Sequence, residues 1–263
     1  MSAFQYHAAA SVADAAKRLK AGATLLSGGM TLIPTIKQGL ASPTELVDLG
    51  KIGELRGVKV EGNEVVVGAT TTHAAVAGSA DVAKKIPALA ALAGGIGEPQ
   101  VRHRGTIGGS IANNDPAADY PAACLGLGAT IVTDGRSIPA DEFFTGLFET
   151  ALGDGEIVTA VRFPTPEAAS YVKFPHPATR FALVGVFVAR TTGGVRVAVT
   201  GASDSGVFRA TELEAALGAN FAADAVNGIK IPADGMADDI HGSADYRAHL
   251  VGVLTRRAVA ACG

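Results

Sequence analysis

Short apolar runs and helix-like segments alternate through the first part of the chain. Ser11 precedes an amphipathic stretch, and this predicts a helix because a serine hydroxyl can accept from the free N–H groups of a first helical turn. Apolar runs at Ala23–Leu26 and Glu45–Leu49 predict buried strands, with a short helix over Leu32–Gln38 between them. Together these elements predict a small α/β unit that ends near Gly57.

The middle of the chain carries a hairpin signal followed by helical periodicity. Two valine-rich runs flank Gly62-Asn63, a dipeptide typical of tight hairpin turns. The pattern predicts strands over Val58–Val60, Val65–Val67, Thr130–Thr133 and Ile157–Phe163, and helices over Thr72–Ala77, Val82–Ala93 (broken before Pro87) and Tyr120–Leu127.

The pattern changes after a proline-containing segment, Pro164–Ala169, which we interpret as a linker. Beyond it the chain predicts antiparallel strands over Tyr171–Phe174, Ala182–Arg190 and Val195–Ala202, then helices over Thr211–Leu217, Ala222–Asn227 and Ser243–Ala260. We therefore predict an α+β protein with domains at residues 1–165 and 170–263, the first of which begins with the small α/β unit that ends near Gly57.

Composition and charge exclude several classes of partner. Of the 263 residues 48% are hydrophobic and 18% charged, and the net charge is −3 with no basic cluster, which argues against nucleic acid or an anionic membrane surface. Cys124 and Cys262 lie far apart without metal-ligand spacing, so no iron–sulfur cluster or structural zinc is expected in this chain. No apolar run reaches the roughly 18 residues of a membrane span. We expect a soluble protein in the reducing cytoplasm.

Two Gly-Gly motifs carry the strongest chemical signal. One reads SGGMT, from Ser27 to Thr31, and the other GTIGGSIANNDPAAD, from Gly105 to Asp119. Glycine can adopt positive φ and lets a ligand approach the bare backbone, and successive N–H groups in such turns form anion-binding concavities. Two such loops suggest one extended ligand held at its pyrophosphate, although a pair of tight strand turns would also explain the glycines.

The same motifs resemble those of a known family. SGGMTLIP followed by LVDL, and GTIGGSIANNDPAADYPAA, are similar to the two flavin motifs in the FAD-binding subunits of molybdenum hydroxylases. That family includes the medium subunits of carbon monoxide dehydrogenase and the flavin subunits of xanthine and nicotinate dehydrogenases. YVKF, FALVGV and SADYRAHLVGVLTRRAV extend the resemblance over essentially the whole chain.

The resemblance implies a vanillyl-alcohol-oxidase-type domain with FAD in the cleft between its two lobes, followed by a smaller α+β domain. It also implies two partners, an iron–sulfur subunit with two 2Fe-2S clusters and a large molybdopterin-binding subunit, in a dimer of heterotrimers. Electrons would pass from the clusters through this flavin to an external acceptor.

The resemblance further implies a set of FAD-binding residues. The first motif supplies Leu25, Leu26, Ser27, Gly28, Gly29, Met30, Thr31 and Leu32, and the second supplies Thr106, Ile107, Gly108, Gly109 and Ser110. Ile96 and Phe181 match the two residues that sandwich the isoalloxazine ring, and Lys173 matches a lysine beside that ring. Asp119 matches an acid that contacts the cofactor, and Val158 matches a position whose backbone contacts the adenine side. Asn113 is a further candidate.

Local explanations compete with these assignments. Asp119 precedes a predicted helix and could be its N-cap, Lys173 could be a solvated strand lysine, and Phe181 could be an ordinary core aromatic. Asn113 could merely cap the turn before Pro116. Met30 and Arg180 depart from the family pattern, in which Gln or His and an acid are common at these positions.

Three functions remain compatible with the sequence. The resemblance favours an electron-transferring flavoprotein subunit. A stand-alone FAD-dependent oxidoreductase of the same fold is the alternative, although the chain lacks a recognisable set of acid and base residues acting on a substrate. A flavin-free assembly factor is disfavoured by the intact glycine motifs.

Overall fold

The first part of the chain forms a small parallel sheet. The computed structural model describes residues 3–262. Residues 1, 2 and 263, which the expected domain bounds include, lie outside the described residues. β1 (Gln5–Ala8), β2 (Thr24–Leu26) and β3 (Glu45–Asp48) pair in the order β1-β3-β2. Helices α1 (Val12–Lys20) and α2 (Leu32–Lys37) connect them. Ser11 caps α1 as predicted, accepting from the Asp14 N–H at 3.1 Å. β1 was not predicted because its residues are half-buried or exposed and form no apolar run.

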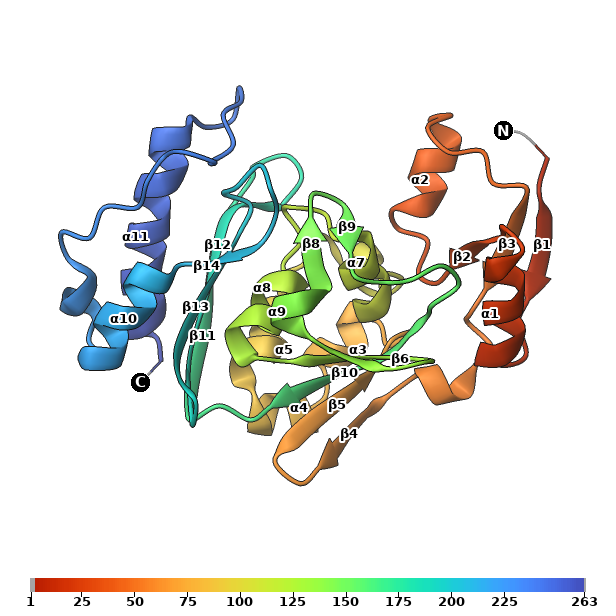
Figure 1. Ribbon diagram of the computed structural model, residues 1–263, viewed down its shortest axis with the longest axis horizontal. Coiled ribbons are helices and arrows are strands. Elements are labelled where there is room, and N and C mark those ends of the chain that lie inside the picture. The colour runs from red at the N-terminus through yellow and green to blue at the C-terminus, as the bar shows by residue number, and fades with distance from the viewer. Residues whose placement is uncertain (1–2, 263) are drawn as a thin grey trace.

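A five-stranded antiparallel sheet forms the centre of the molecule (Figure 1). Its strands are β4 (Val58–Glu61), β5 (Glu64–Gly68), β10 (Val158–Pro164), β6 (Thr130–Thr133) and β7 (Ser137–Pro139), in that order. Its inner face packs against helices α3 (His73–Ala77), α4 (Ala80–Lys85), α5 (Pro87–Gly94), α7 (Ile107–Asn113) and α8 (Tyr120–Leu127).

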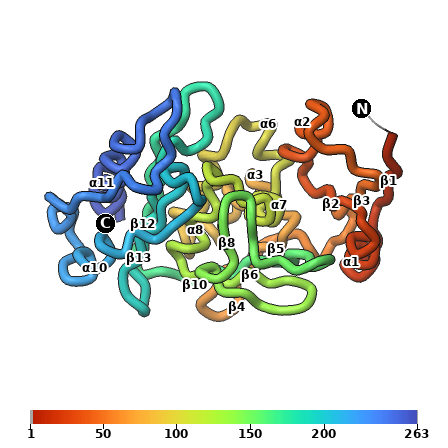
Figure 2. The backbone as a smooth tube through the Cα atoms, turned by 45° about the horizontal axis from the view of Figure 1, so that its top comes forward, coloured from red at the N-terminus to blue at the C-terminus, as the bar shows by residue number. Residues whose placement is uncertain are grey.

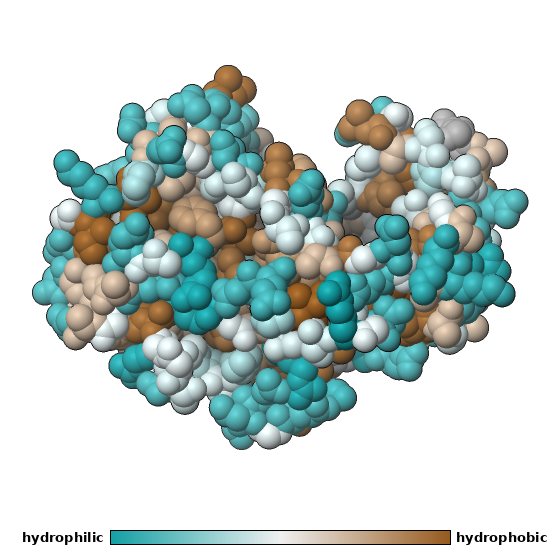
Figure 3. Space-filling view, viewed as in Figure 1, coloured by the Kyte–Doolittle hydropathy of each residue, from teal (hydrophilic) through white to brown (hydrophobic). Residues whose placement is uncertain are grey.

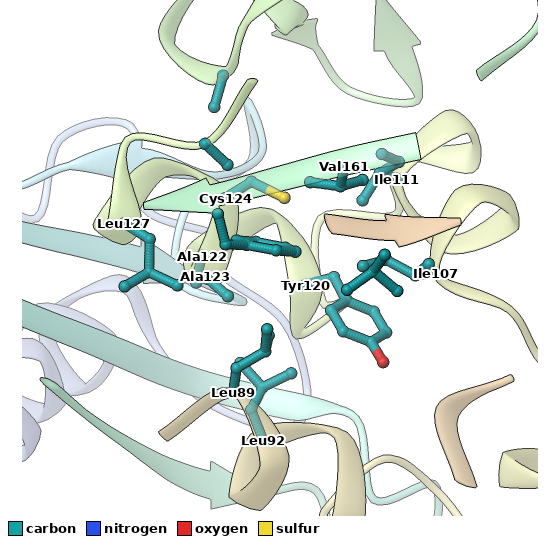
Figure 4. Packing of buried hydrophobic residues seen from close by; sticks show 14 of the residues in the cluster. Leu89, Leu92, Ile107, Ile111, Tyr120, Ala122, Ala123, Cys124, Leu127 and Val161 are labelled. Carbon is teal, nitrogen blue, oxygen red and sulfur yellow. The ribbon is translucent and has the colours of Figure 1, made fainter. Parts of the chain in front are cut away.

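Helix α8 is buried along its whole length. Every residue from Tyr120 to Leu127 is buried, as expected for a helix that is apolar on all sides. Its side chains meet those of α5, α7 and β10 in the largest apolar cluster, where Leu89, Leu92, Ile107 and Val161 converge (Figure 4). This cluster fixes α7, and therefore the second glycine motif, to the central sheet.

A second antiparallel sheet separates this cluster from the C-terminal helices. It consists of β11 (Ala168–Pro175), β12 (Ala182–Thr191), β13 (Gly194–Thr200) and β14 (Phe208–Arg209). Phe187 joins the central cluster, whereas Val186 on the opposite face packs with α10 (Thr211–Ala219) and α11 (Ala244–Ala260). Figure 2 shows β1 and α11 at opposite ends of the molecule.

Most of the predicted helices and strands are present, with shifted ends. The segment interpreted as a linker is shorter than expected, because β10 ends at Pro164 and β11 begins at Ala168. The helix predicted over Ala222–Asn227 is a 3-10 helix over Ala223–Val226. Several elements that were not predicted are too short to show periodicity: the 3-10 helix Gly53–Leu55, α6 (Pro99–Arg102), α9 (Ala140–Phe143), β8 (Phe144–Gly146), β9 (Glu149–Thr150), and the strands β7 and β14. None of the helices described is long and apolar enough to cross a membrane.

Candidate functional site

The two glycine motifs meet where the N-terminal α/β unit joins the rest of the molecule. Figure 3 shows the surface hollowed here, between α2 and the β8–β9 hairpin. The Ser27 and Thr106 hydroxyl oxygens lie 2.9 Å apart. A Cβ on Gly28 would collide with the carbonyl of Arg104, so this glycine allows the backbones of the two motifs to touch. The motifs, far apart in sequence, therefore form one site.

The first motif presents a row of unused backbone donors. Within residues 3–262 the N–H groups of residues 27–31 make no hydrogen bond, and their residues are half-buried or exposed. Gly29 has a φ of +73°, a left-handed conformation that favours glycine. Backbone N–H groups are obligatory donors, so a run of free ones in a glycine turn fits the oxygens of an anionic ligand.

The second motif is the start of a helix, which corrects our interpretation of it as a loop. Thr106 is the N-cap of α7, accepting from the Gly109 N–H at 3.3 Å. Neither Gly108 nor Gly109 has a positive φ. The N–H groups of Ile107 and Gly108 are already taken, donating to Thr71 and Ala69 carbonyls at 3.1 and 2.8 Å.

The glycines of the second motif therefore differ in purpose. Gly108 is buried, and a Cβ there would lie 2.6 Å from the Ala69 Cβ, so its role is close packing against the end of β5. Gly109 is exposed and Ser110 half-buried. The Gly109 N–H donates to Thr106 Oγ1 and the Ser110 N–H donates to the Thr106 carbonyl. This motif therefore offers a ligand in the hollow the Ser110 hydroxyl and the exposed backbone of Gly109, next to the Thr106 hydroxyl.

The end of α7 positions a hairpin rather than a ligand. Asn114 has a left-handed φ of 43° and donates from Nδ2 to the carbonyls of Gly146 and Glu149 at 2.9 and 2.8 Å. It thus anchors the β8–β9 hairpin beside the hollow. Its neighbour Asn113 is half-buried.

Asp119 does not cap helix α8, contrary to the local explanation. Its backbone is helical and its side chain makes no capping bond. Instead, with 4% of its side chain exposed, its Oδ1 accepts from the Tyr171 hydroxyl at 2.6 Å and from Lys173 Nζ at 2.9 Å. Burial raises the pKa of Asp119, while Lys173 and Tyr171 oppose that shift by favouring the carboxylate.

Lys173 is not a solvated strand lysine. Only 11% of its side chain is exposed, and it also donates to the Gly95 carbonyl at 2.9 Å. It therefore ties strand β11 to the start of α8 and to the segment that contains Ile96. Sequence reasoning missed Tyr171, although its spacing of two residues from Lys173 places both on one face of a strand.

Phe181 is not a core aromatic either, because 47% of it is exposed. It follows Arg180, which has a left-handed φ of 60° and contacts Glu98 at 2.9 Å. Glu98 lies two residues beyond Ile96, whose carbonyl accepts from Arg102 at 2.9 Å. The two segments expected to flank a flavin ring are thus linked by an ion pair.

The remaining predicted site residues lie in or next to β2, α2 and β10. Leu25 and Leu26 belong to β2, Met30 is 38% exposed, and Thr31 and Leu32 begin α2. Val158 begins β10 and is buried in the central cluster.

His73 is bonded to the start of the second motif through its backbone. Its N–H donates to the Gly105 carbonyl at 2.9 Å, and its ring lies 5.3 Å from that of Tyr120. Burial, with a smaller contribution from the charge of Arg102, lowers the pKa of His73 to about 4, so the imidazole is neutral at physiological pH.

A cavity of about 830 Å³ lies away from the glycine motifs, between the start of α1, the 3-10 helix Gly53–Leu55 and the outer face of the central sheet. Arg56, Lys59 and Arg162 line it together with Glu54 and Asp134. None of the predicted FAD-binding residues lines it, so this cavity is separate from the candidate FAD site.

Comparison with known proteins finds relatives that match almost the whole chain. Residues 2–166 match the model of a family described as the FAD binding domain in molybdopterin dehydrogenase. The carbon monoxide dehydrogenase medium chain of Hydrogenophaga pseudoflava is 35% identical, over 97% of this chain and 96% of that protein. The nicotine 6-hydroxylase medium subunit of Paenarthrobacter nicotinovorans is 34% identical over 100% of this chain and 98% of that subunit.

Solved structures show the same similarity in three dimensions. The crystal structure of a cyanide-inactivated Cu,Mo-CO dehydrogenase superposes with a TM-score of 0.89 at 35% identity, covering 98% of this chain and 97% of that one. Quinoline 2-oxidoreductase from Pseudomonas putida 86 gives a TM-score of 0.87 at 28% identity, covering 99% and 97%. The likeness thus extends over both the central and the C-terminal sheets.

Proposed function

Because the chain belongs to the family of FAD-binding domains of molybdopterin dehydrogenases, we propose that it is the FAD-binding electron-transfer subunit of a molybdenum hydroxylase complex. Its relatives are the medium chains or subunits of multi-subunit dehydrogenases and hydroxylases. The chain would take electrons from the iron–sulfur clusters of a partner subunit and deliver them through FAD to an external acceptor.

The observation that carries this proposal is the row of free N–H groups at Ser27–Thr31. A pyrophosphate carries negative charge, and backbone donors can meet it without a dedicated arginine. From the second motif, the Ser110 hydroxyl and the exposed backbone of Gly109 would face it, beside the Thr106 hydroxyl that lies 2.9 Å from that of Ser27. This donor set fits the cofactor that the family binds.

We assign the other residues by the same argument. Asp119 would accept a hydrogen bond from a hydroxyl of the cofactor, and the backbone at Val158 would lie near the adenine. Ile96 and Phe181 would flank the flavin ring, with Lys173 near its edge. Leu25, Leu26 and Leu32 would line the hollow beside the phosphates, and Asn113 would donate from its amide.

FAD, when bound, supplies the redox chemistry, and the chain supplies binding and electrostatics. Lys173 and Asp119 would keep a balanced pair of charges close to the cofactor. The exposed Phe181 would shield one face of the ring from water and from unwanted acceptors. No proton or electron step requires a nucleophile or general base from this chain.

The architecture and assembly complete the proposal. We infer a vanillyl-alcohol-oxidase-type domain at residues 1–165, with FAD between lobes of about 1–57 and 58–165, and a second domain at 170–263. An iron–sulfur subunit and a molybdopterin-binding subunit would join it in a dimer of heterotrimers. Two free cysteines are in keeping with a cytoplasmic complex.

Purification of the native complex tests this function. We expect this chain to co-purify with an iron–sulfur and a molybdenum subunit, and the complex to contain FAD, iron and molybdenum. Recovery of the chain as a homo-oligomer that oxidises a substrate by itself would instead support a stand-alone FAD-dependent oxidoreductase.

A further inference from the structure

The side chain of Tyr171 is closely packed, and its hydroxyl lies next to a glycine. It donates to Oδ1 of Asp119 at 2.6 Å, and its ring lies 6.1 Å from that of Phe187, tilted by 30°. A Cβ on Gly185, in the adjacent strand β12, would collide with this hydroxyl. Packing therefore holds the Tyr171 side chain in one position, with its donor aimed at Asp119.

Two donors converge on the same oxygen of Asp119. Lys173 also contacts Oδ1, at 2.9 Å. No side chain in the described part of the chain, residues 3–262, donates to Oδ2. A carboxylate oxygen can accept two hydrogen bonds, so Oδ2 keeps its capacity for a ligand donor.

We propose that Tyr171 is a positioning residue of the FAD site, which holds the Asp119 carboxylate so that Oδ2 accepts a hydroxyl of FAD. This inference rests on the proposed function. Tyr171 acts through Asp119, since its own hydroxyl is already committed to Oδ1.

The physical consequence concerns both the orientation and the charge of Asp119. Without the Tyr171 donor only one side chain, Lys173, still holds Oδ1, so the orientation of the carboxylate is less well fixed. Loss of a hydrogen bond to the carboxylate also raises the pKa of Asp119 further above its ordinary value. The titratable groups that face Asp119 are Tyr171 and Lys173 from β11 and Tyr120 from α8.

The test compares two tyrosine-to-phenylalanine variants of the whole chain, freed of cofactor and titrated with FAD. Tyr171→Phe removes the donor to Asp119. Tyr120→Phe is the matched control, because its buried hydroxyl has no partner among the residues described. We expect Tyr171→Phe to weaken FAD binding about tenfold and to move the loss of FAD on acidification to higher pH. Tyr120→Phe should change neither.

A double variant shows whether Tyr171 acts through Asp119. In an Asp119→Asn background, Tyr171→Phe should cause no further loss of FAD affinity, because coupled residues are non-additive. Circular dichroism melting confirms that each variant is folded. If Tyr171→Phe alone does not fold, Gly185→Ala replaces it, because its Cβ would displace the Tyr171 hydroxyl, and it should weaken FAD binding in the same way.

The possible failures are distinguishable. If wild-type chain binds no FAD, the proposed function and this inference both fail. If wild type binds FAD but Tyr171→Phe matches Tyr120→Phe in affinity and pH profile, or remains additive with Asp119→Asn, the inference about Tyr171 is wrong and the function stands.

Discussion

The buried imidazole of His73 predicts a specific loss of stability in acid. Its pKa is about 4 in the folded protein, against an ordinary value of 6.5. Between those pH values His73 is protonated in the unfolded chain but not in the folded chain. The free energy of unfolding therefore falls as the pH decreases from about 6.5, and this contribution of His73 levels off near pH 4. At 1.36 kcal/mol per pH unit, the difference amounts to about 3 kcal/mol.

The assay is urea denaturation of wild type and His73→Gln between about pH 4 and 8. Other groups titrate in both proteins, so the difference between their free energies of unfolding isolates His73. From pH 7 to pH 4 the free energy of unfolding of wild type should fall by about 3 kcal/mol more than that of His73→Gln. His249→Gln is the control, since His249 is exposed on α11. A constant difference between wild type and His73→Gln across this range would refute the account of a neutral, buried His73.

Three further predictions concern the site. Gly28→Ala should weaken FAD binding and cost about 1–3 kcal/mol of stability, because its Cβ meets the carbonyl of Arg104, just before the second motif. Gly252→Ala is the control, since a Cβ there lies in open space on α11. Equal effects of the two variants in FAD titration and urea denaturation would contradict this prediction. Lys173→Met should lower the free energy of unfolding, measured in urea, by about 3 kcal/mol, because it leaves the buried carboxylate of Asp119 without its cation. Adding Asp119→Asn should restore part of this stability, and a double variant with no restored stability would argue against the ion pair. Phe181→Ala should leave stability within about 0.5 kcal/mol, because the side chain is half exposed, yet shift the visible spectrum of bound FAD; an unchanged spectrum would remove Phe181 from the ring.

The sequence predicted the elements whose signals are local. Tyr120–Leu127 is an uninterrupted apolar run closed by Gly128, which adopts a left-handed φ of 62° at the end of α8. The hairpin around Gly62 is of the same kind, with its glycine at a φ of 61°. Such turns and caps depend on a few neighbouring residues, so they can be inferred from the sequence itself.

Features set by distant contacts escaped prediction. Glycines alone did not distinguish a loop from the start of a helix, although Thr106, three residues before Gly109, is a possible N-cap. Asp119 has the local signature of a cap, yet Tyr171, 52 residues later, takes its carboxylate. The resemblance supplied candidate residues for the site, but the sequence did not show that the N–H groups of Ile107 and Gly108 donate to carbonyls of the protein itself.

The location of the phosphate-binding donors is the central claim, and amide NMR tests it most directly. In a titration of ¹⁵N-labelled, cofactor-free chain with FAD, the backbone amide resonances of Ser27–Thr31 should shift strongly, because these N–H groups acquire acceptors. The amides of Ile107 and Gly108, already bonded to carbonyls, should shift much less. Saturation with FAD that leaves Ser27–Thr31 unshifted, or no binding of FAD by the folded chain, would contradict the account.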